Sequence, residues 1–465
     1  MKTINYEIME LTGDTETPIS IYLKTKQNNP IFLLESAERG EQTGRYSFIG
    51  YYPWLSVNGY KNHTLITKNK KTEELINSSP ITTLKNLLSE YNTQNLGLPF
   101  YGGLTGYFSY DFIRYLEVLP DTNIDDLNLP FFNLSAPAVY IIFDHLFHKL
   151  FLVGVINPDS NFRDIKILMD KVKTNIEKPL KQEILAKNTS TTNDTKSNLT
   201  KHEFIKMVNK AKEYITKGDI FQVVLSQRFN INVNYSSFQL YRKLRKVNPS
   251  PYMFLLNYNG YSLIGSSPEV HVKKTGKTTL IRPIAGTRIR GKDLVEDKRL
   301  AKELLEDKKE LAEHTMLVDL GRNDIGKVCI PGSIKLKDSF RIEHYSHVMH
   351  IVSDVEGELK KDISSVELLA STFPAGTVSG APKIRAMEII DELENIKRGP
   401  YSGAVGYLDF NGDMDTAITI RTIVKKGDNC YIQAGAGIVY DSNPENEYFE
   451  TINKAKAQIK TITED

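Results

Sequence analysis

Cysteine is nearly absent from this chain. Only Cys329 and Cys430 occur among 465 residues. Two cysteines are too few for a disulfide framework or for a metal site built from thiolates. This usage is typical of a reducing compartment, and we expect the protein to be cytoplasmic.

Long apolar runs and blocks of one charge are also missing. No stretch is long enough to cross a membrane, and the N-terminal MKTINYEIMELTGDTETP has no apolar signal core. The formal net charge is +2, and no basic run is interleaved with aromatic residues, so nothing indicates a nucleic-acid partner. The 40% hydrophobic and 25% charged residues are those of a globular protein, long enough for two or three domains or one large assembly.

The clearest change in composition along the chain is a polar segment at 186–200. Its sequence, AKNTSTTNDTKSNLT, has no periodicity and predicts a surface loop or linker. The regions on either side, 1–185 and 201–465, are both rich in strand-like segments and could complete each other's sheets. Many meandering strands with interspersed helices favour an α+β fold over a doubly wound sheet.

Several elements in the second region have clear local signals. Thr200 and Glu203 form a capping box at a helix start, and Gly321 is expected to end a later helix. Asn443 and Pro444 suit the beginning of the last helix. The patterns predict strands at 221–233, 252–258 and 261–267, helices around 294–320 and 382–395, and hairpins within 402–440.

An arginine interrupts the apolar segment TAITIRTIV, which is predicted to be one strand over 416–424. The guanidinium of Arg421 cannot be deprotonated, so it must meet an anion or lie at the mouth of a cleft. Gly435 and Gly437 follow in the next strand and allow a ligand to approach the backbone closely. This combination is typical of a site for an anionic substrate.

Two pairs of glutamates each lie one helical turn apart. Glu310 and Glu313 share a helix face with Leu317 and so continue an apolar stripe. Glu447 and Glu450 lie away from the apolar face of the last helix and, taken alone, are predicted to face solvent. Facing one cavity, the two pairs would offer hard oxygen ligands to Mg²⁺. The alternative is capping and solvated acids.

Three shorter segments also contain candidate groups. The glycine loops RPIAGTR (282–288) and FPAGTVSGAPK (373–383) suit binding of a carboxylate, or are ordinary loops. Glu269 follows a strand and a proline, which suits a general acid if burial raises its pKa; an exposed turn acid is the alternative. His350 lies in strand-like sequence, either as a structural residue or as one that titrates near neutrality.

Together these segments resemble the chorismate-utilising enzymes over nearly the whole chain. Within that family the sequence is similar to the large subunits of anthranilate synthases. The resemblance implies two packed, largely antiparallel sheets surrounded by helices, with chorismate bound between them. The signatures are LLES (33–36), GRYSFIG (44–50), GDIFQVVLSQRF (218–229), NPSPYMF (248–254), IRPIAGTRIRG (281–291), EHTMLVDLGRND (313–324), FPAGTVSGAPK (373–383) and YSGAVGYLDFNGDMDTAITIRT (401–422).

The resemblance implies a Mg²⁺ cofactor. Carried over by position, Glu313 and Glu450 would contact the metal directly, and Glu310 and Glu447 would act largely through bound water. The metal would hold the ring carboxylate of chorismate and so neutralise and orient the substrate.

The rest of the substrate site is implied in the same way. The Gly286 backbone and the Thr287 hydroxyl would assist at the ring carboxylate. Lys454 also has a simpler role, because it lies four residues after Glu450 and can pair with it. The residues implied to hold the enolpyruvyl carboxylate are Tyr401, Arg421, Gly435 and Lys454.

The resemblance also implies the reaction. Glu269 would protonate the departing ring hydroxyl as ammonia adds, and His350 would assist the later elimination. Family members that add water have a lysine base where Gln222 stands, and members that make 4-amino-4-deoxychorismate have a lysine where Ala285 stands. Both residues favour anthranilate as product, with 4-amino-4-deoxychorismate synthase as the alternative.

A regulatory site and a partner are further implications. The family's feedback inhibitor tryptophan would bind in the N-terminal region, although core packing explains the apolar members of the set equally well. A catalytically silent amino-acid sensor is a third hypothesis, disfavoured by the retained catalytic residues. Neither cysteine lies in a nucleophile-like turn, so ammonia is expected from a separate glutamine amidotransferase subunit. The residues implied for tryptophan are Ser36, Pro251, Tyr252, Met253, Val405 and Tyr407.

Overall fold

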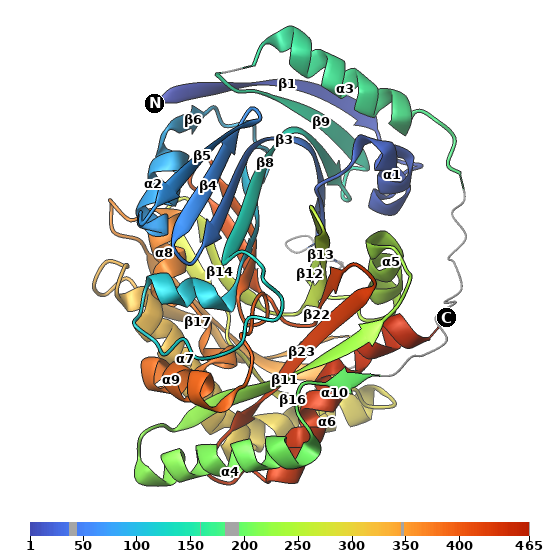
Figure 1. Ribbon diagram of the computed structural model, residues 1–465. Helices are drawn as coiled ribbons and strands as arrows, with labels where there is room; N and C mark the ends of the chain where they lie inside the picture. Colours follow the sequence, from blue (N-terminus) through green and yellow to red (C-terminus); the bar gives the residue numbers. More distant parts are fainter. Residues whose placement is uncertain (37–43, 159, 182–194, 346–347, 465) are drawn as a thin grey trace.

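The strands of the protein join into one continuous network with helices around it (Figure 1). The computed structural model describes residues 1–36, 44–158, 160–181, 195–345 and 348–464. Among these residues, β1 (Lys2–Thr12) and β6 (Tyr91–Thr93) form the one parallel pair of named strands. The predicted α+β class is confirmed, and no helix in these ranges is long and apolar enough to span a membrane.

Two long strands, β3 (Tyr46–Tyr60) and β8 (Phe132–Asp144), pair with each other and join two arms of the network. One arm extends from β8, and we call it the first arm. It runs through β7 (Gly103–Phe108), β20 (Ala404–Asp409), β21 (Met414–Ile418), β14 (Val270–Thr275), β15 (Thr278–Ile281) and β18 (Val348–Glu358), with β16 (Ile284–Ile289) and β17 (Lys335–His344) beside β18.

The second arm extends from β3 and contains strands from both halves of the sequence. Short strands β10 (Lys196–Ser197) and β19 (Gly380–Ala381) pair with its last member. Its strands are β2 (Phe32–Glu35), β12 (Tyr252–Tyr258), β13 (Tyr261–Ser267), β22 (Thr422–Lys426), β23 (Asn429–Ile438) and β11 (Gln222–Asn232).

The remaining elements surround these arms. β9 (Lys149–Ile156) pairs with β1 and β8, and β4 (His63–Lys68) and β5 (Lys71–Ile76) extend β3. The helices are α1 (Pro18–Thr25), α2 (Pro80–Ser89), α3 (Phe162–Ile176), α4 (Lys201–Lys217), α5 (Ser237–Val247), α6 (Leu294–Glu306), α7 (Lys308–Gly326), α8 (Ser365–Thr372), α9 (Lys383–Leu393) and α10 (Pro444–Thr463).

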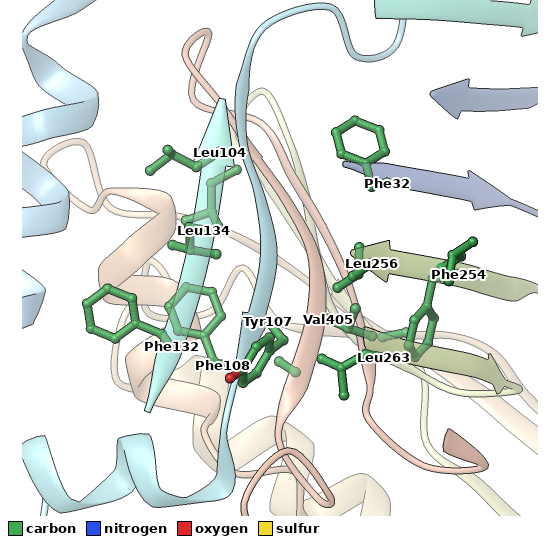
Figure 2. Close-up of a cluster of buried hydrophobic side chains, with 14 of the residues drawn as sticks. Phe32, Leu104, Tyr107, Phe108, Phe132, Leu134, Phe254, Leu256, Leu263 and Val405 are labelled. Carbon is green, nitrogen blue, oxygen red and sulfur yellow. The ribbon is translucent and has the colours of Figure 1, made fainter. Parts of the chain in front are cut away.

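The two arms pack face to face through apolar side chains. Figure 2 shows Tyr107 and Val405 of the first arm opposite Phe254 and Leu263 of the second. These side chains are at most 3% exposed. Burial of the two apolar faces therefore holds the arms together, as in other packed sheets.

Most of the predicted elements are present. Thr200 and Glu203 form the expected capping box at the start of α4, and Asn443 caps α10. The strand predictions match β11, β12 and β13, and the late hairpins are β20–β21 and β22–β23. Residues 186–194 of the predicted linker lie outside the described residues. Its last residues, 195–200, contain β10 and the cap of α4.

The prediction of one strand over 416–424 is wrong. β21 ends at Ile418 and β22 begins at Thr422, and Arg421 between them has a left-handed φ of 53°. β21 pairs within the first arm, whereas β22 pairs within the second. The chain therefore crosses between the arms at Arg421, and the apolar run hides the crossing because both strands are buried.

The prediction that a helix ends at Gly321 is also wrong. The expected helix is present as α6 and α7, which meet at Asp307, and α7 continues to Gly326. Gly321 is buried in this helix, where an added Cβ would meet Ile281 Cγ2 at 3.5 Å, an ordinary contact. This glycine therefore does not serve as a helix stop.

Candidate active site

A cavity of ≈ 760 Å³ opens between the two arms and the helices α7 and α10. Strands β16 and β18 of the first arm and β11 and β23 of the second contribute to its wall. Every residue that the sequence predicted for catalysis, substrate or metal lines it. They are Glu269, Gly286, Thr287, Glu310, Glu313, His350, Tyr401, Arg421, Gly435, Glu447, Glu450 and Lys454.

The four glutamates bring negative charge to this cavity from two helices. Burial raises the pKa of Glu313, and the charges of Glu310 and Glu450 raise it further. Burial also raises the pKa of Glu447, again with a contribution from Glu450. The carboxylates of α7 and α10 therefore repel one another across the cavity. The expectation that Glu447 and Glu450 face solvent is confirmed for Glu450, whose side chain is 44% exposed, but Glu447 is partly buried, and both line the cavity.

The same carboxylates have protein partners. Glu310 Oε1 lies 3.3 Å from Arg288 Nη1, Glu450 Oε1 lies 2.6 Å from Lys454 Nζ, and Gln222 Nε2 donates to Glu313 Oε1 at 3.4 Å. Within the described ranges, no three His, Cys, Asp or Glu side chains are gathered closely enough to hold a metal. Hard oxygen donors with excess negative charge nonetheless fit Mg²⁺, which keeps several of its waters and needs few direct carboxylates.

Glu269 is a further acid of the cavity wall. It follows β13, is 8% exposed, and has a pKa that burial raises to about 8. The alternative of an exposed turn acid is therefore wrong. A carboxyl group that holds its proton at neutral pH can act as a general acid.

His350 is held in one orientation by the neighbouring strand. Its Nδ1 lies 2.9 Å from the Gly286 carbonyl oxygen and 3.1 Å from Thr287 Oγ1. Burial lowers the pKa of His350, so the ring is neutral. A neutral ring that donates from Nδ1 to the carbonyl leaves the Nε2 lone pair free to accept a proton.

Gly286 lies at an irregularity in the β16–β18 pairing and has a φ of 67°. A Cβ at this position would lie 3.2 Å from Glu310 Oε2. A side chain here would therefore be strained and would crowd the first glutamate pair.

Arg421 reaches the cavity from the crossing between the arms. Its side chain is partly buried, and this burial lowers its pKa, although a guanidinium stays charged. It donates to the Lys454 carbonyl oxygen and has no ion pair among the residues that the structure describes. A partly buried cation without a carboxylate partner is suited to bind an anionic ligand.

Lys454 and Tyr401 lie near Gly435 in the same cavity as Arg421. Lys454 Nζ donates to the Gly435 carbonyl oxygen at 3.1 Å while it also pairs with Glu450. An added Cβ on Gly435 would lie 2.7 Å from the Tyr401 hydroxyl. The absence of a side chain at this position therefore keeps the Tyr401 hydroxyl and the backbone accessible.

Sequence reasoning missed several polar residues of this cavity. Asn446 and Asn453 lie on the same face of α10 as Glu450, one turn before and one turn after it. That spacing was visible in the sequence and could have identified them. Lys309 and Thr377 also line the cavity, but no periodic signal distinguishes them.

The six residues implied for tryptophan lie apart from this cavity. Met253 pairs with Glu35, which places Ser36 beside Tyr252 at the end of β2. The Tyr252 hydroxyl donates to Asp415 Oδ1 at 2.9 Å, and Asp415 is the register partner of Tyr407. Met253 and Val405 are 1% and 3% exposed, so core packing also accounts for these two. Pro251 precedes Tyr252 in the chain.

Comparisons with known proteins agree with this geometry. The profile of the family described as chorismate binding enzyme matches residues 29–460. Anthranilate synthase component 1 of Acetivibrio thermocellus is 47% identical over 98% of this chain and 94% of that relative. The corresponding protein of Aquifex aeolicus is 45% identical over 98% and 95%.

Solved structures show the same similarity. Anthranilate synthase component I from Streptococcus pneumoniae superposes with a TM-score of 0.82 and 37% identity, over 91% of this chain and 95% of that one. The menaquinone-specific isochorismate synthase of Escherichia coli has a TM-score of 0.74 at 18% identity, over 99% and 96%, and so shares the fold.

Proposed function

This chain belongs to the family of chorismate-binding enzymes, and from that premise we propose that it acts as the chorismate-binding component of an anthranilate synthase. The reaction would convert chorismate and ammonia to anthranilate and pyruvate, the first committed step towards tryptophan. The observation that carries this proposal is the gathering of a protonated acid, unpaired Arg421 and two glutamate pairs in one cavity.

The two carboxylates of chorismate would occupy different walls of the cavity. Arg421 and Lys454, with the Tyr401 hydroxyl, would bind the enolpyruvyl carboxylate beside Gly435. The ring carboxylate would lie near the Gly286 backbone and the Thr287 hydroxyl.

The glutamates of α7 and α10 would hold Mg²⁺ next to the ring carboxylate. Glu313 and Glu450 are proposed as direct ligands, and Glu310 and Glu447 as partners through water. When bound, the metal neutralises the carboxylate and orients the substrate. Glu450 would exchange its contact with Lys454 for the metal, which frees the Lys454 ammonium for the enolpyruvyl carboxylate.

The chain's own groups would move two protons. Glu269 would donate its proton to the ring hydroxyl as the carbon–oxygen bond breaks and ammonia adds, and water would leave. The nitrogen of the added ammonia would release one proton to solvent. His350 would later accept a ring proton at Nε2 as pyruvate is eliminated and the ring becomes aromatic. Glu269 is buried and His350 is partly buried, so both groups would act in a site with little bulk water.

Two residues favour ammonia over other nucleophiles. Gln222 lines the cavity and donates to Glu313, and an amide cannot deprotonate water. Ala285 lines the same cavity and offers no amine for a covalent intermediate. The second candidate, 4-amino-4-deoxychorismate synthase, is disfavoured by Ala285.

The ammonia source and the regulation are further parts of the proposal. A separate glutamine amidotransferase would supply ammonia, because both Cys329 and Cys430 are buried and burial raises the pKa of each thiol, to about 11 and about 12. Tryptophan would inhibit by binding beside Ser36, Tyr252 and Tyr407, where Asp415 links the two tyrosines.

A product assay tests the function. The purified chain is incubated with chorismate, Mg²⁺ and ammonium, and products are separated by chromatography. We expect fluorescent anthranilate and an equal amount of pyruvate, and no turnover with glutamine alone. Isochorismate or 4-amino-4-deoxychorismate as the main product would reject the proposal, and turnover with glutamine alone would reject the separate subunit.

A further inference from the structure

A second, much smaller cavity lies behind Glu269. Its volume is ≈ 30 Å³, and it shares Glu269, Leu317 and Thr377 with the main cavity. The opposite wall is formed by α7 at Gly321 and Asp324. We call this space the side chamber. Glu269 therefore lines both the proposed substrate cavity and the side chamber.

Buried polar atoms line the side chamber. His271 Nδ1 is buried and has no hydrogen-bond partner among the described residues, and the Thr377 hydroxyl lies beside the Glu269 carboxyl group and lowers its pKa. His271 Nε2 lies 3.4 Å from the Thr372 carbonyl oxygen, which leaves Nδ1 as an acceptor. Buried polar atoms of this kind are usually satisfied by ordered water, and the volume suits about one or two molecules.

The far wall of the side chamber carries a buried ion pair. Lys383 Nζ donates to Asp324 Oδ2 at 2.6 Å and to the Thr372 carbonyl oxygen at 3.2 Å. Burial raises the pKa of Asp324 and lowers that of Lys383, so the proton between them is shared more evenly than in water. Asp324 Oδ1 lies 3.9 Å from Lys327, whose side chain is 57% exposed. The pair therefore lies between the side chamber and an exposed lysine.

We propose that water in the side chamber carries protons from the Asp324–Lys383 pair to Glu269 and so restores the general acid after each turnover. This inference rests on the proposed role of Glu269 as a proton donor. Asp324 and Lys383 are positioning and relay groups in this scheme, since neither touches the main cavity.

The proton balance closes in five transfers. Glu269 gives its proton to the departing hydroxyl and becomes a carboxylate. A chamber water then gives one proton to Glu269 and takes one from Asp324, which has received it from the Lys383 ammonium. The pair regains its proton from solvent at Asp324 Oδ1, beside Lys327. No atom other than hydrogen moves along this route.

Gly321 gives the side chamber its space. A Cβ on this residue would enter the side chamber and meet Ile281 and Pro283 only at 3.5 and 3.8 Å. Alanine therefore fits without a clash and is a better helix former than glycine. Gly321→Ala is expected to fold well and to displace the water. Gly326→Ala in the same helix is the matched control, because its Cβ would lie 3.7 Å from Ile334 and outside the side chamber.

The experiment compares chorismate consumption by the wild type, Gly321→Ala and Gly326→Ala in H₂O and D₂O. For Gly321→Ala we expect kcat to fall about tenfold with unchanged KM and a larger solvent isotope effect on kcat, because proton return becomes limiting. Asp324→Asn, checked for folding by circular dichroism, should show the same isotope effect. Gly326→Ala should match the wild type.

A high-resolution crystal structure of the wild type supplies the second measurement. Ordered water between Glu269 and Asp324, lost in Gly321→Ala, is the expected result. Equal kcat and isotope effects in the wild type and Gly321→Ala, or a side chamber without water, would overturn the relay. Wild-type protein that consumes chorismate without making anthranilate would instead contradict the proposed function and leave the relay measurement valid.

Discussion

The two arms enclose a dry, closely packed space at one end and a charged cavity at the other. At the packed end, Tyr107, Leu134 and Leu263 are fully buried among other apolar side chains (Figure 2). At the cavity end, Arg421 and Glu313 are partly buried without full compensation of their charge. The first arrangement stabilises the fold, whereas the second lowers stability, as is typical of a binding site.

This difference predicts that stability and activity can be separated by mutation. Substitutions at the cavity end should reduce turnover and leave stability unchanged or higher. Substitutions at the packed end should reduce stability and leave the turnover of folded molecules unchanged.

The largest effect is expected from Glu269→Gln, which removes the proposed proton donor. Its kcat should fall by about 10²–10⁴. In the wild type, kcat/KM should decline as pH rises through about 8, where Glu269 loses its proton. Steady-state rates between pH 6 and 9.5 check this, and a wild-type profile that is flat through this range would contradict the assignment.

The same substitution also tests the cost of burying this acid. Between the ordinary pKa of 4.5 and about 8, the unfolded chain has released the Glu269 proton and the native chain keeps it. This group therefore makes wild-type stability fall as pH rises through that window. Glu269→Gln lacks this fall of stability with pH. The Tm of the variant minus that of the wild type should therefore be larger at pH 8 than at pH 5.

The next effect concerns the glutamate pairs. Glu313→Gln removes a proposed metal ligand and should lower turnover roughly 100- to 1,000-fold at saturating Mg²⁺. Its Tm without Mg²⁺ should equal or exceed that of the wild type, because repulsion from Glu310 and Glu450 is relieved. Unchanged turnover would reject Glu313 as a ligand. Glu306→Gln on the exposed end of α6 is the control.

At the packed end, Leu134→Ala should show the reverse pattern. Removing a fully buried side chain typically lowers the free energy of unfolding by about 2–5 kcal/mol. Urea unfolding followed by fluorescence measures the loss. Turnover per folded molecule should equal that of the wild type, and a matching fall in kcat would show that the two ends are coupled.

The smallest effect is expected beside Tyr252. Ser36→Ala should raise the tryptophan concentration needed for half inhibition by about fivefold, the equivalent of one lost hydrogen bond. Turnover without tryptophan should not change, since Ser36 does not line the cavity. Equal inhibition of variant and wild type would place the inhibitor elsewhere.

Much of the fold was predictable because its elements have local signals. The capping box at Thr200 and the strand patterns of β12 and β13 depend on neighbouring residues alone. The crossing at Arg421 was missed because two buried strands with different partners read as one apolar run. Gly321 was misassigned as a helix stop because local rules cannot distinguish a glycine that ends a helix from one inside a helix that lines a cavity.

The candidate site shows the same division. Arg421 interrupts an apolar run, and the first glutamate pair lies on an apolar helix face. These charged residues in apolar surroundings could therefore be identified from the sequence. Glu447 and Glu450 agree with a solvated face, and only the approach of α10 to α7 in the fold places them in the cavity. A residue that joins a site only through the packing of distant segments, such as Glu450, cannot be identified from its neighbours in the sequence.

The central claim is that chorismate and Mg²⁺ bind together between Arg421 and the glutamates of the cavity end. Calorimetric titration of the wild type with chorismate, with and without Mg²⁺ and in the absence of ammonium, tests it most directly. We expect Mg²⁺ to tighten chorismate binding at least about tenfold, as for a coupling of roughly 1–3 kcal/mol. Chorismate affinity that is the same with and without Mg²⁺ would contradict the claim.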